Sequence, residues 1–136
     1  MTRSILKSAA WLIIVLLVLE GCDSTSEPAP LPGPIILITN QWKEVDNENH
    51  VFELTSENDD GESEGVFTGI EFIDITVNDP DDQHDLTGSW ANGRVEFTVD
   101  RDGVETTYEA TFTEDAPSQL SFTAGSETLV LFKEEL

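Results

Sequence analysis

The chain has few residues of the kinds that usually build catalytic or metal sites. Of its 136 residues, one is cysteine, two are histidine and six are lysine or arginine. A single cysteine excludes a disulfide within the chain. Two histidines, His50 and His84, are too few for a zinc site built from histidine. Neither lies in a recognisable serine–histidine motif, so we expect both to be solvated and assign no catalytic residue.

Long apolar runs are also scarce. The longest lies at Trp11–Leu19, and even counted from Ala9 it is shorter than the roughly 20 apolar residues of a membrane-spanning helix. Because Arg3 and Lys7 precede it, the pattern predicts a secretory signal peptide over residues 1–21. The alternative is a short anchor helix that is not cleaved.

The only cysteine directly follows this apolar run, in the sequence Leu19-Glu20-Gly21-Cys22. These residues resemble the bacterial lipobox, in which a leucine, a variable residue and a small residue precede an invariant cysteine. The resemblance implies that the Cys22 thiol receives a diacylglycerol and that the chain is cleaved just before it. Two or more acyl chains, such as palmitate, give stable membrane attachment. We therefore expect a lipoprotein of the cell envelope, lipid-anchored to a bacterial membrane and facing the periplasm or the exterior.

A proline-rich stretch separates the cysteine from the rest of the chain. Four of the six prolines lie at alternate positions in residues 23–34, DSTSEPAPLPGP. Such a tract favours polyproline II and cannot enter a sheet or a helix interior. We expect residues 22–34 to be the lipidated cysteine and its linker. Residues 35–136 are then a single domain by size.

The second half of the chain predicts three β-hairpins with two-residue turns. The turns are expected at 92–93 (Asn-Gly), 102–103 (Asp-Gly) and 125–126 (Gly-Ser). Folding at all three places the large apolar side chains on one face, whereas a one-residue slip would bring polar groups inward. The expected facing pairs are Trp90 with Val95, Phe97 with Tyr108, and Phe122 with Leu129.

The first half is less regular. Residues 35–42 and 50–55 read as strands, and the alternation over 66–77 changes phase between Phe72 and Ile73, which indicates a β-bulge or a corner. No segment after the signal peptide has a helical period. We predict an all-β domain of about eight antiparallel strands in meander order, closed as a barrel or a two-sheet sandwich.

Two loose resemblances concern this architecture. Residues 86–92, LTGSWAN, resemble the first strand of avidin-like barrels, a likeness confined to seven residues. A meander with an early tryptophan, Trp42, is similar to lipocalin-like proteins. The second resemblance implies a barrel that carries a small apolar ligand.

The charge is strongly one-sided. Residues 22–136 keep 27 acidic and four basic residues, a net charge of −23. This excludes nucleic acid as a partner and disfavours binding to anionic lipid. In the expected hairpins Glu96 faces Glu109 and Asp100 faces Glu105, and such like-charge pairs are destabilising. Salt would offset them by screening, and the composition of an acidic protein with little lysine resembles that of halophilic proteins.

Divalent cations would offset the charge in another way. The stretch 79–85, DPDDQHD, is dense in carboxylates that calcium prefers, but the EF-hand spacing fails and we assign no metal site. We expect no enzyme and no cofactor, and only non-specific cations. Three functions stay open: an interaction or structural module, a lipocalin-like carrier of a small apolar ligand, and a calcium-stabilised extracellular module. Protein, glycan and apolar small molecules remain candidate partners.

Overall fold

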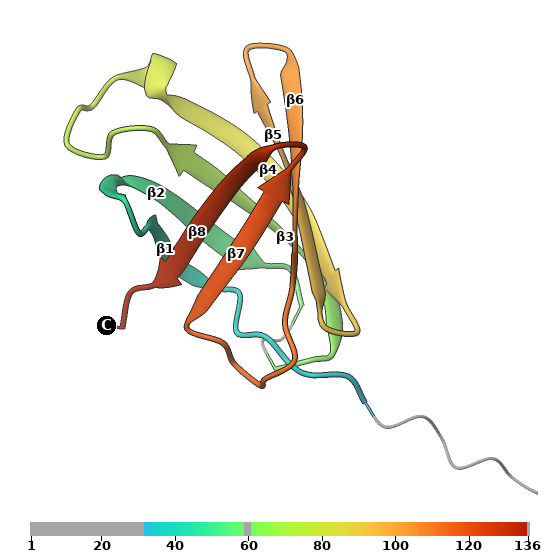
Figure 1. Ribbon diagram of the computed structural model, residues 1–136. Coiled ribbons are helices and arrows are strands. Elements are labelled where there is room, and N and C mark those ends of the chain that lie inside the picture. Colours follow the sequence, from blue (N-terminus) through green and yellow to red (C-terminus); the bar gives the residue numbers. More distant parts are fainter. Residues whose placement is uncertain (1–31, 59–60, 136) are drawn as a thin grey trace, which may run out of the picture. The chain divides into compact units, whose positions relative to one another are not determined.

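Eight antiparallel strands, each paired with the next along the chain, close into a barrel through β1 and β8 (Figure 1). The computed structural model describes residues 32–58 and 61–135. Its strands are β1 (Asn40–Glu44), β2 (Asn47–Ser56), β3 (Glu64–Phe72), β4 (Gln83–Ala91), β5 (Arg94–Arg101), β6 (Val104–Thr111), β7 (Gln119–Ala124) and β8 (Glu127–Lys133). One short 3₁₀-helix, η1 (Pro80–Asp82), precedes β4. The predicted all-β meander of eight strands is confirmed, and its closed form is the barrel.

The three predicted hairpins form in the predicted register. Asn92 and Gly93 have φ of 51° and 79°, and Asp102 and Gly103 have φ of 56° and 86°, as type I′ turns require. Their strands pair with the large apolar side chains on one side of the sheet. The observed pairs are Trp90 with Val95, Phe97 with Tyr108, and Phe122 with Leu129.

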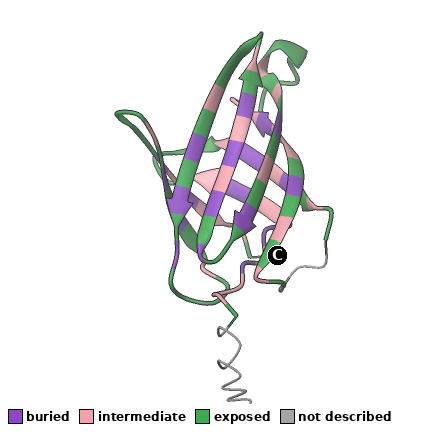
Figure 2. Ribbon diagram, turned by 90° about the vertical axis from the view of Figure 1, so that its right-hand side faces the viewer, coloured by how far each residue is buried: buried purple, intermediate pink, exposed green. Residues whose placement is uncertain are grey.

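The core lies inside the barrel and is rich in aromatic side chains. Buried and exposed residues alternate along most strands (Figure 2), because successive side chains point to opposite faces. The ring of Phe97 lies at the centre, with centroids 5.0 Å from Phe122, 5.2 Å from Tyr108 and 5.7 Å from Phe52. Rings at these distances pack favourably beyond the area that they bury.

The segment before β1 closes one end of the barrel. Ile36 and Ile38 are fully buried in the same core, and Trp42 Nε1 donates a hydrogen bond to the Ile38 carbonyl at 3.0 Å. Residues 35–42 were predicted to form a strand, which is wrong for residues 35–39, since β1 begins only at Asn40. The alternating apolar residues are nevertheless explained, because this segment packs its isoleucines into the barrel.

The prediction for residues 66–77 was also wrong. We expected a bulge or a corner at the change of phase, but β3 simply ends at Phe72. Register with β4 shows that Gly69 and Glu71 point inward, so that Ile70 and Phe72 lie on the outer wall. The apolar alternation in β3 therefore marks the outside of the barrel rather than its core.

Within residues 32–58 and 61–135, no helix is long and apolar enough to cross a membrane. This finding concerns only the part of the chain that the structure describes.

Phe97→Ala should destabilise the barrel by about 3–5 kcal/mol, because Phe97 is 1 % exposed and contacts three other rings. Urea unfolding monitored by tryptophan fluorescence would measure the loss. Thr98→Ala is the matched control, because Thr98 lies on the outer wall, where its hydroxyl pairs with that of Thr107. A loss at Phe97 no larger than that at Thr98 would contradict this packing.

Candidate functional site

The one lipid-attachment residue predicted from the sequence, Cys22, lies outside the described residues. Among the residues described, the feature that calls for a chemical explanation is a buried carboxylate. Glu71, on an inward position of β3, is the one charged residue in this part of the chain that is fully buried. A buried charge is costly unless it is paired and hydrogen-bonded. We therefore take Glu71 and its partners as the candidate site.

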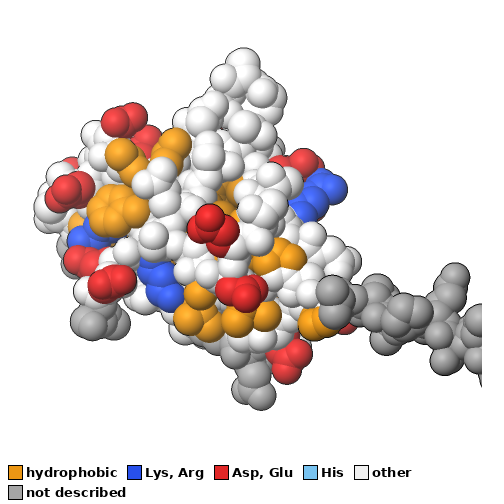
Figure 3. Space-filling view, turned by 60° about the horizontal axis from the view of Figure 1, so that its bottom comes forward, with side chains coloured by type: hydrophobic (Ala, Val, Ile, Leu, Met, Phe, Trp, Pro, Cys, Tyr) orange, Lys and Arg blue, Asp and Glu red, His pale blue; other side chains and the backbone are white. Residues whose placement is uncertain are grey.

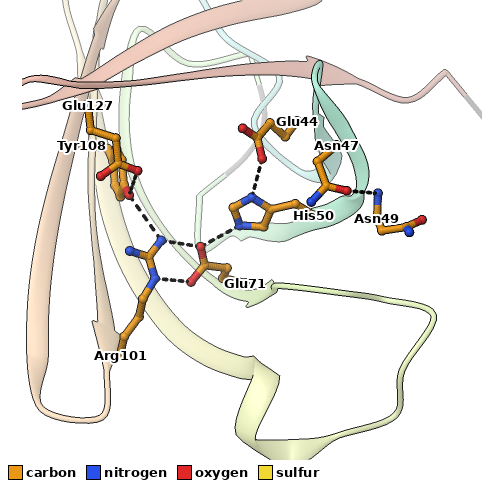
Figure 4. A network of polar contacts seen from close by, with 8 residues as sticks. All are labelled: Glu44, Asn47, Asn49, His50, Glu71, Arg101, Tyr108 and Glu127. Carbon is orange, nitrogen blue, oxygen red and sulfur yellow. Dashed lines mark hydrogen bonds and ion pairs between the residues drawn. The ribbon is translucent and has the colours of Figure 1, made fainter.

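Two cationic groups from other strands meet Glu71 (Figure 4). Arg101, at the end of β5, donates from Nε to Oε2 at 2.8 Å and from Nη2 to Oε1. His50, on β2, lies 2.8 Å from Oε1 through Nε2. The arginine bond is bidentate, the geometry in which guanidinium and carboxylate bind most strongly. Three strands are thus joined across the barrel interior through one carboxylate.

The network continues outward on both sides. His50 Nδ1 lies 2.7 Å from Glu44 at the end of β1. Arg101 Nη2 donates to the Tyr108 hydroxyl at 3.3 Å, and that hydroxyl donates to Glu127 of β8 at 2.9 Å. All these residues lie at the end of the barrel opposite Ile36 and Ile38. The six residues Glu44, His50, Glu71, Arg101, Tyr108 and Glu127, here called the network, therefore cover the aromatic core at this end.

The network shifts the ionisation of its members. Burial alone would raise the pKa of Glu71, but hydrogen bonds and charge from Arg101 and His50 outweigh it and lower the pKa from 4.5 to about 2. Burial alone would lower the pKa of His50, but its hydrogen bonds to Glu71 and Glu44 outweigh this and raise it above 6.5. For Tyr108, burial is the main cause of a raised pKa. The three groups are thus held in the forms that satisfy the network.

The arrangement of the network residues fits a structural role better than a catalytic or metal-binding one. Glu44 contacts Nδ1 of His50 and Glu71 contacts Nε2, so the two carboxylates lie on opposite sides of the imidazole ring. The three side chains therefore do not converge on a common position where a substrate or metal ion could bind. In the part of the chain that the structure describes, no three His, Cys, Asp or Glu residues are placed to hold a metal ion together. Every buried side-chain nitrogen and oxygen there has a hydrogen-bond partner. Each network charge is therefore already used to compensate another.

Two expectations about histidine and charge need correction or refinement. We expected His50 to be solvated, which is wrong, since its side chain is only 13 % exposed. The like charges of Glu96 and Glu109 do face each other, and Arg94 binds both, at 3.1 and 2.7 Å. One of the four basic residues of the domain therefore offsets the repulsion that the hairpin creates.

The acidic stretch at residues 79–85 serves local structure. Asp79 caps η1, with its carboxylate accepting a hydrogen bond from the Asp81 amide at 3.0 Å. Asp79 and Asp81 are exposed and Asp82 is half-buried, and none of the three belongs to a metal-binding group among the residues described. The structure thus lends no support to calcium at this stretch.

His50→Gln tests the network through pH. Because the folded-state pKa of His50 is raised, its stabilising effect is fully present below the unfolded value of 6.5 and is lost as pH rises through the folded value. The free energy of unfolding of the native chain should therefore exceed that of His50→Gln most at pH 5.5–6.5, and the gap should narrow toward pH 9. Urea titrations across this range measure the gap.

Thr98→Ala is the control, because Thr98 has no titratable side chain and lies on the outer wall, away from the network. The difference in unfolding free energy between this variant and the native chain should not change with pH. A gap for His50→Gln that stayed constant or widened with rising pH would contradict the protonated His50 in the network.

A comparison of the chain with models of known protein families, with curated proteins and with solved structures finds no match.

Proposed function

We propose that this protein is a lipid-anchored cell-envelope protein whose barrel is a non-catalytic interaction or structural module that works through its outer surface. The observation that carries the proposal is the filled interior. A carrier needs an open space among the inward-facing side chains, and a module that binds on its outside does not.

The side chains that would line a ligand cavity instead fill the barrel. Trp90, Phe97 and Tyr108 are at most 1 % exposed. On the neighbouring strands glycines make room for the large rings: a Cβ at Gly65 would overlap the Trp90 indole, and one at Gly88 would overlap the Phe67 ring. An eight-stranded barrel can be filled by side chains or can hold one small ligand, and the burial of these rings favours the filled form here. The lipocalin-like alternative thus loses its support.

The chain enters the barrel at one end, which is consistent with a module that is anchored through its N-terminal linker. Pro32 leads directly into the segment that closes one end, and the network lies at the other. Pro32 lies ten positions after Cys22, and this stretch can span at most about 35 Å. A lipid on Cys22 would therefore tether the closed end and leave the strand walls and the far end accessible to a partner.

The polar network supports a role without catalysis. Glu71, Arg101 and His50 have the residue types of an acid–base site, but each is committed to another member of the network. A catalytic acid or base must reach a substrate proton, and Glu71 is fully buried with its oxygens occupied. The network joins β2, β3 and β5 to one another.

Cys22→Ala tests the anchor. The native protein, expressed in full length in a bacterial host, should fractionate with membranes and show an N-terminal Cys22 carrying acyl mass. The variant should keep residues 1–21 and lack the acyl mass, because lipidation requires the thiol. Mass spectrometry of the purified proteins measures both properties.

Ser24→Ala is the control, since it changes a neighbouring residue and leaves the thiol in place. It should be processed and anchored like the native chain. A mature native N-terminus at another residue, without an acyl mass, would overturn the lipoprotein assignment while leaving the filled interior untouched.

A further inference from the structure

The outer wall of the barrel over β2 to β6 carries a row of threonines. In order across the five strands, each paired with the next, they are Thr55, Thr68, Thr87, Thr98 and Thr107. Their side chains point away from the core, since the residues that flank them on each strand point inward. With neighbouring strands about 4.8 Å apart, the row is roughly 19 Å long. It forms a narrow strip of hydroxyl groups across the barrel wall.

Other outward side chains border the row on both sides. Residues two positions apart along a strand share a face, so each threonine has one outward neighbour before it and one after it. The first rim consists of Glu53, Ile70, Asp85, Asp100 and Glu105. The second rim consists of Glu57, Val66, Ser89, Glu96 and Glu109. The row and its two rims are here called the threonine groove.

The surface is hollowed along the row. One hollow of about 480 Å³ is lined by Thr55, Thr68 and Thr87. A second, of about 440 Å³, shares Thr68 and Thr87 and adds Thr98. A third, of about 190 Å³, shares Thr87 and Thr98 and reaches the first rim. Because adjoining hollows share their floor residues, they form one continuous groove across the strands.

The first rim carries charge that the barrel does not neutralise. Asp100 faces Glu105 directly across two strands, and Asp85 lines the same hollow. Like charges in such positions are destabilising. In the part of the chain that the structure describes, neither these three residues nor Glu53 forms an ion pair. The second rim differs, because Arg94 binds both of its facing glutamates.

The basic residues of the barrel are committed elsewhere. Lys43, Arg94 and Arg101 each form an ion pair with a glutamate, and the Lys133 ammonium group donates to the Leu37 carbonyl at 3.4 Å. In Figure 3 the basic side chains lie beside acidic ones, whereas other acidic side chains have no basic neighbour in that view. A positive charge that complements the first rim must therefore come from a partner.

The width of the groove selects an extended chain as the occupant. The rims are four positions apart along each strand, about 13 Å, and the rim side chains take up part of that distance. An α-helix, about 10–12 Å across, is too wide for the remaining space, whereas an extended chain fits. Threonine hydroxyls both donate and accept hydrogen bonds, so the floor suits the amides and carbonyls of such a chain.

The geometry of an extended chain also indicates which of its side chains are basic. Successive side chains point to opposite sides, so every second one would face the first rim. Four basic residues at alternate positions span about 20 Å, close to the length of the row. The carboxylates that they would meet are those of Glu53, Asp85, Asp100 and Glu105. The residues between them would face the second rim, where Arg94 disfavours further positive charge.

We propose that the threonine groove binds an extended segment of a partner protein that carries Lys or Arg at alternate positions. The inference rests on the proposed function, because it takes the outer surface as the working surface and names the groove and the chemistry of its partner. Complementary charge of this kind guides association and sets the register of binding. It does not depend on the lipid at Cys22.

Calorimetric titration of the full-length chain in a non-ionic detergent tests the groove. The probe is the peptide Arg-Ser-Arg-Ser-Arg-Ser-Arg, which should bind one per barrel at about 0.1 M NaCl and at least about tenfold more weakly at about 1 M. The comparison peptide Arg-Arg-Arg-Arg-Ser-Ser-Ser has the same composition and charge. It should bind severalfold more weakly, because only half of its arginines can face the first rim at once.

Two variants of the groove separate its charge from its floor. The triple variant Glu53→Gln, Asp85→Asn, Glu105→Gln keeps the shape of the first rim and should weaken binding of the alternating peptide at least about tenfold. Thr87→Val keeps the charge and the branched shape at the centre of the floor. It should weaken binding severalfold, because a hydroxyl that bonds to the peptide is lost.

The matched control removes the same number of charges outside the groove. Its substitutions are Asp46→Asn, Glu48→Gln and Glu114→Gln, all at exposed positions in or next to loops. Binding of the alternating peptide should change by less than about twofold, because distant surface charges are screened. Circular dichroism should show every variant folded like the native chain, since the substituted side chains lie outside the core.

Three results would overturn the proposal. The first is an equal loss of binding in the two triple variants, which would mean that the peptide responds to the net charge of the whole chain. The second is equal affinity for the two peptides. The third is binding that molar salt does not weaken. All three would leave the filled interior intact, whereas a ligand cavity inside the barrel would overturn the proposed function without changing these titrations.

Discussion

The interior of this eight-stranded barrel is packed with its own side chains, and the other features of the structure follow from that packing. Two of the large rings are accommodated where the neighbouring strand has a glycine. Trp90 therefore lies over Gly65, and Phe67 lies over Gly88. The isoleucines of the segment before β1 complete the filling at one end. Because large and small residues are matched across strands, one register is favoured over a slipped one.

The same constraint determines where charge can lie. Interior positions near the middle of the barrel are apolar, and the one fully buried charge of the described residues, Glu71, lies near an end where Arg101 and His50 reach it. A buried ion pair adds little net stability over an apolar replacement, but it is costly to break. The network therefore specifies how β2, β3 and β5 meet more than it stabilises them. The remaining acids lie outside, where solvent and salt screen them.

Much of the fold was predictable because two kinds of sequence signal agree. The turn residues and the alternation of apolar and polar residues in the flanking strands indicate the same strand register. Asn92-Gly93 and Asp102-Gly103 require positive φ, and the flanking residues then place Trp90, Phe97 and Tyr108 on one side. The same reasoning failed over residues 66–77, where a bulge or a corner was expected at the change of phase, but β3 ends at Phe72 and its apolar residues Ile70 and Phe72 lie outside. Local alternation shows which residues share a face, but not which face is inside. That choice depends on glycines matched to rings on the neighbouring strand.

The candidate site was not predictable from the sequence for a related reason. Glu71 and Arg101 are 30 residues apart, and His50 lies on a third strand, so that only the closed barrel brings them together. One signal was present: Glu71 shares its side of β3 with Gly65, Phe67 and Gly69. Once that side is known to be inward, a carboxylate there requires a cationic partner. With 28 acidic residues in the chain, the sequence alone does not single out Glu71.

The filled interior is the observation on which the proposed role of the outer surface rests. Xenon enters dry apolar cavities, which makes it a direct probe of unfilled space in a barrel of this kind. A crystal structure of the protein under xenon pressure would locate any such space. No xenon is expected among Trp90, Phe97 and Tyr108 inside the barrel, because these side chains are buried against one another and their neighbours. A well-occupied xenon atom between those rings would contradict it and restore the carrier.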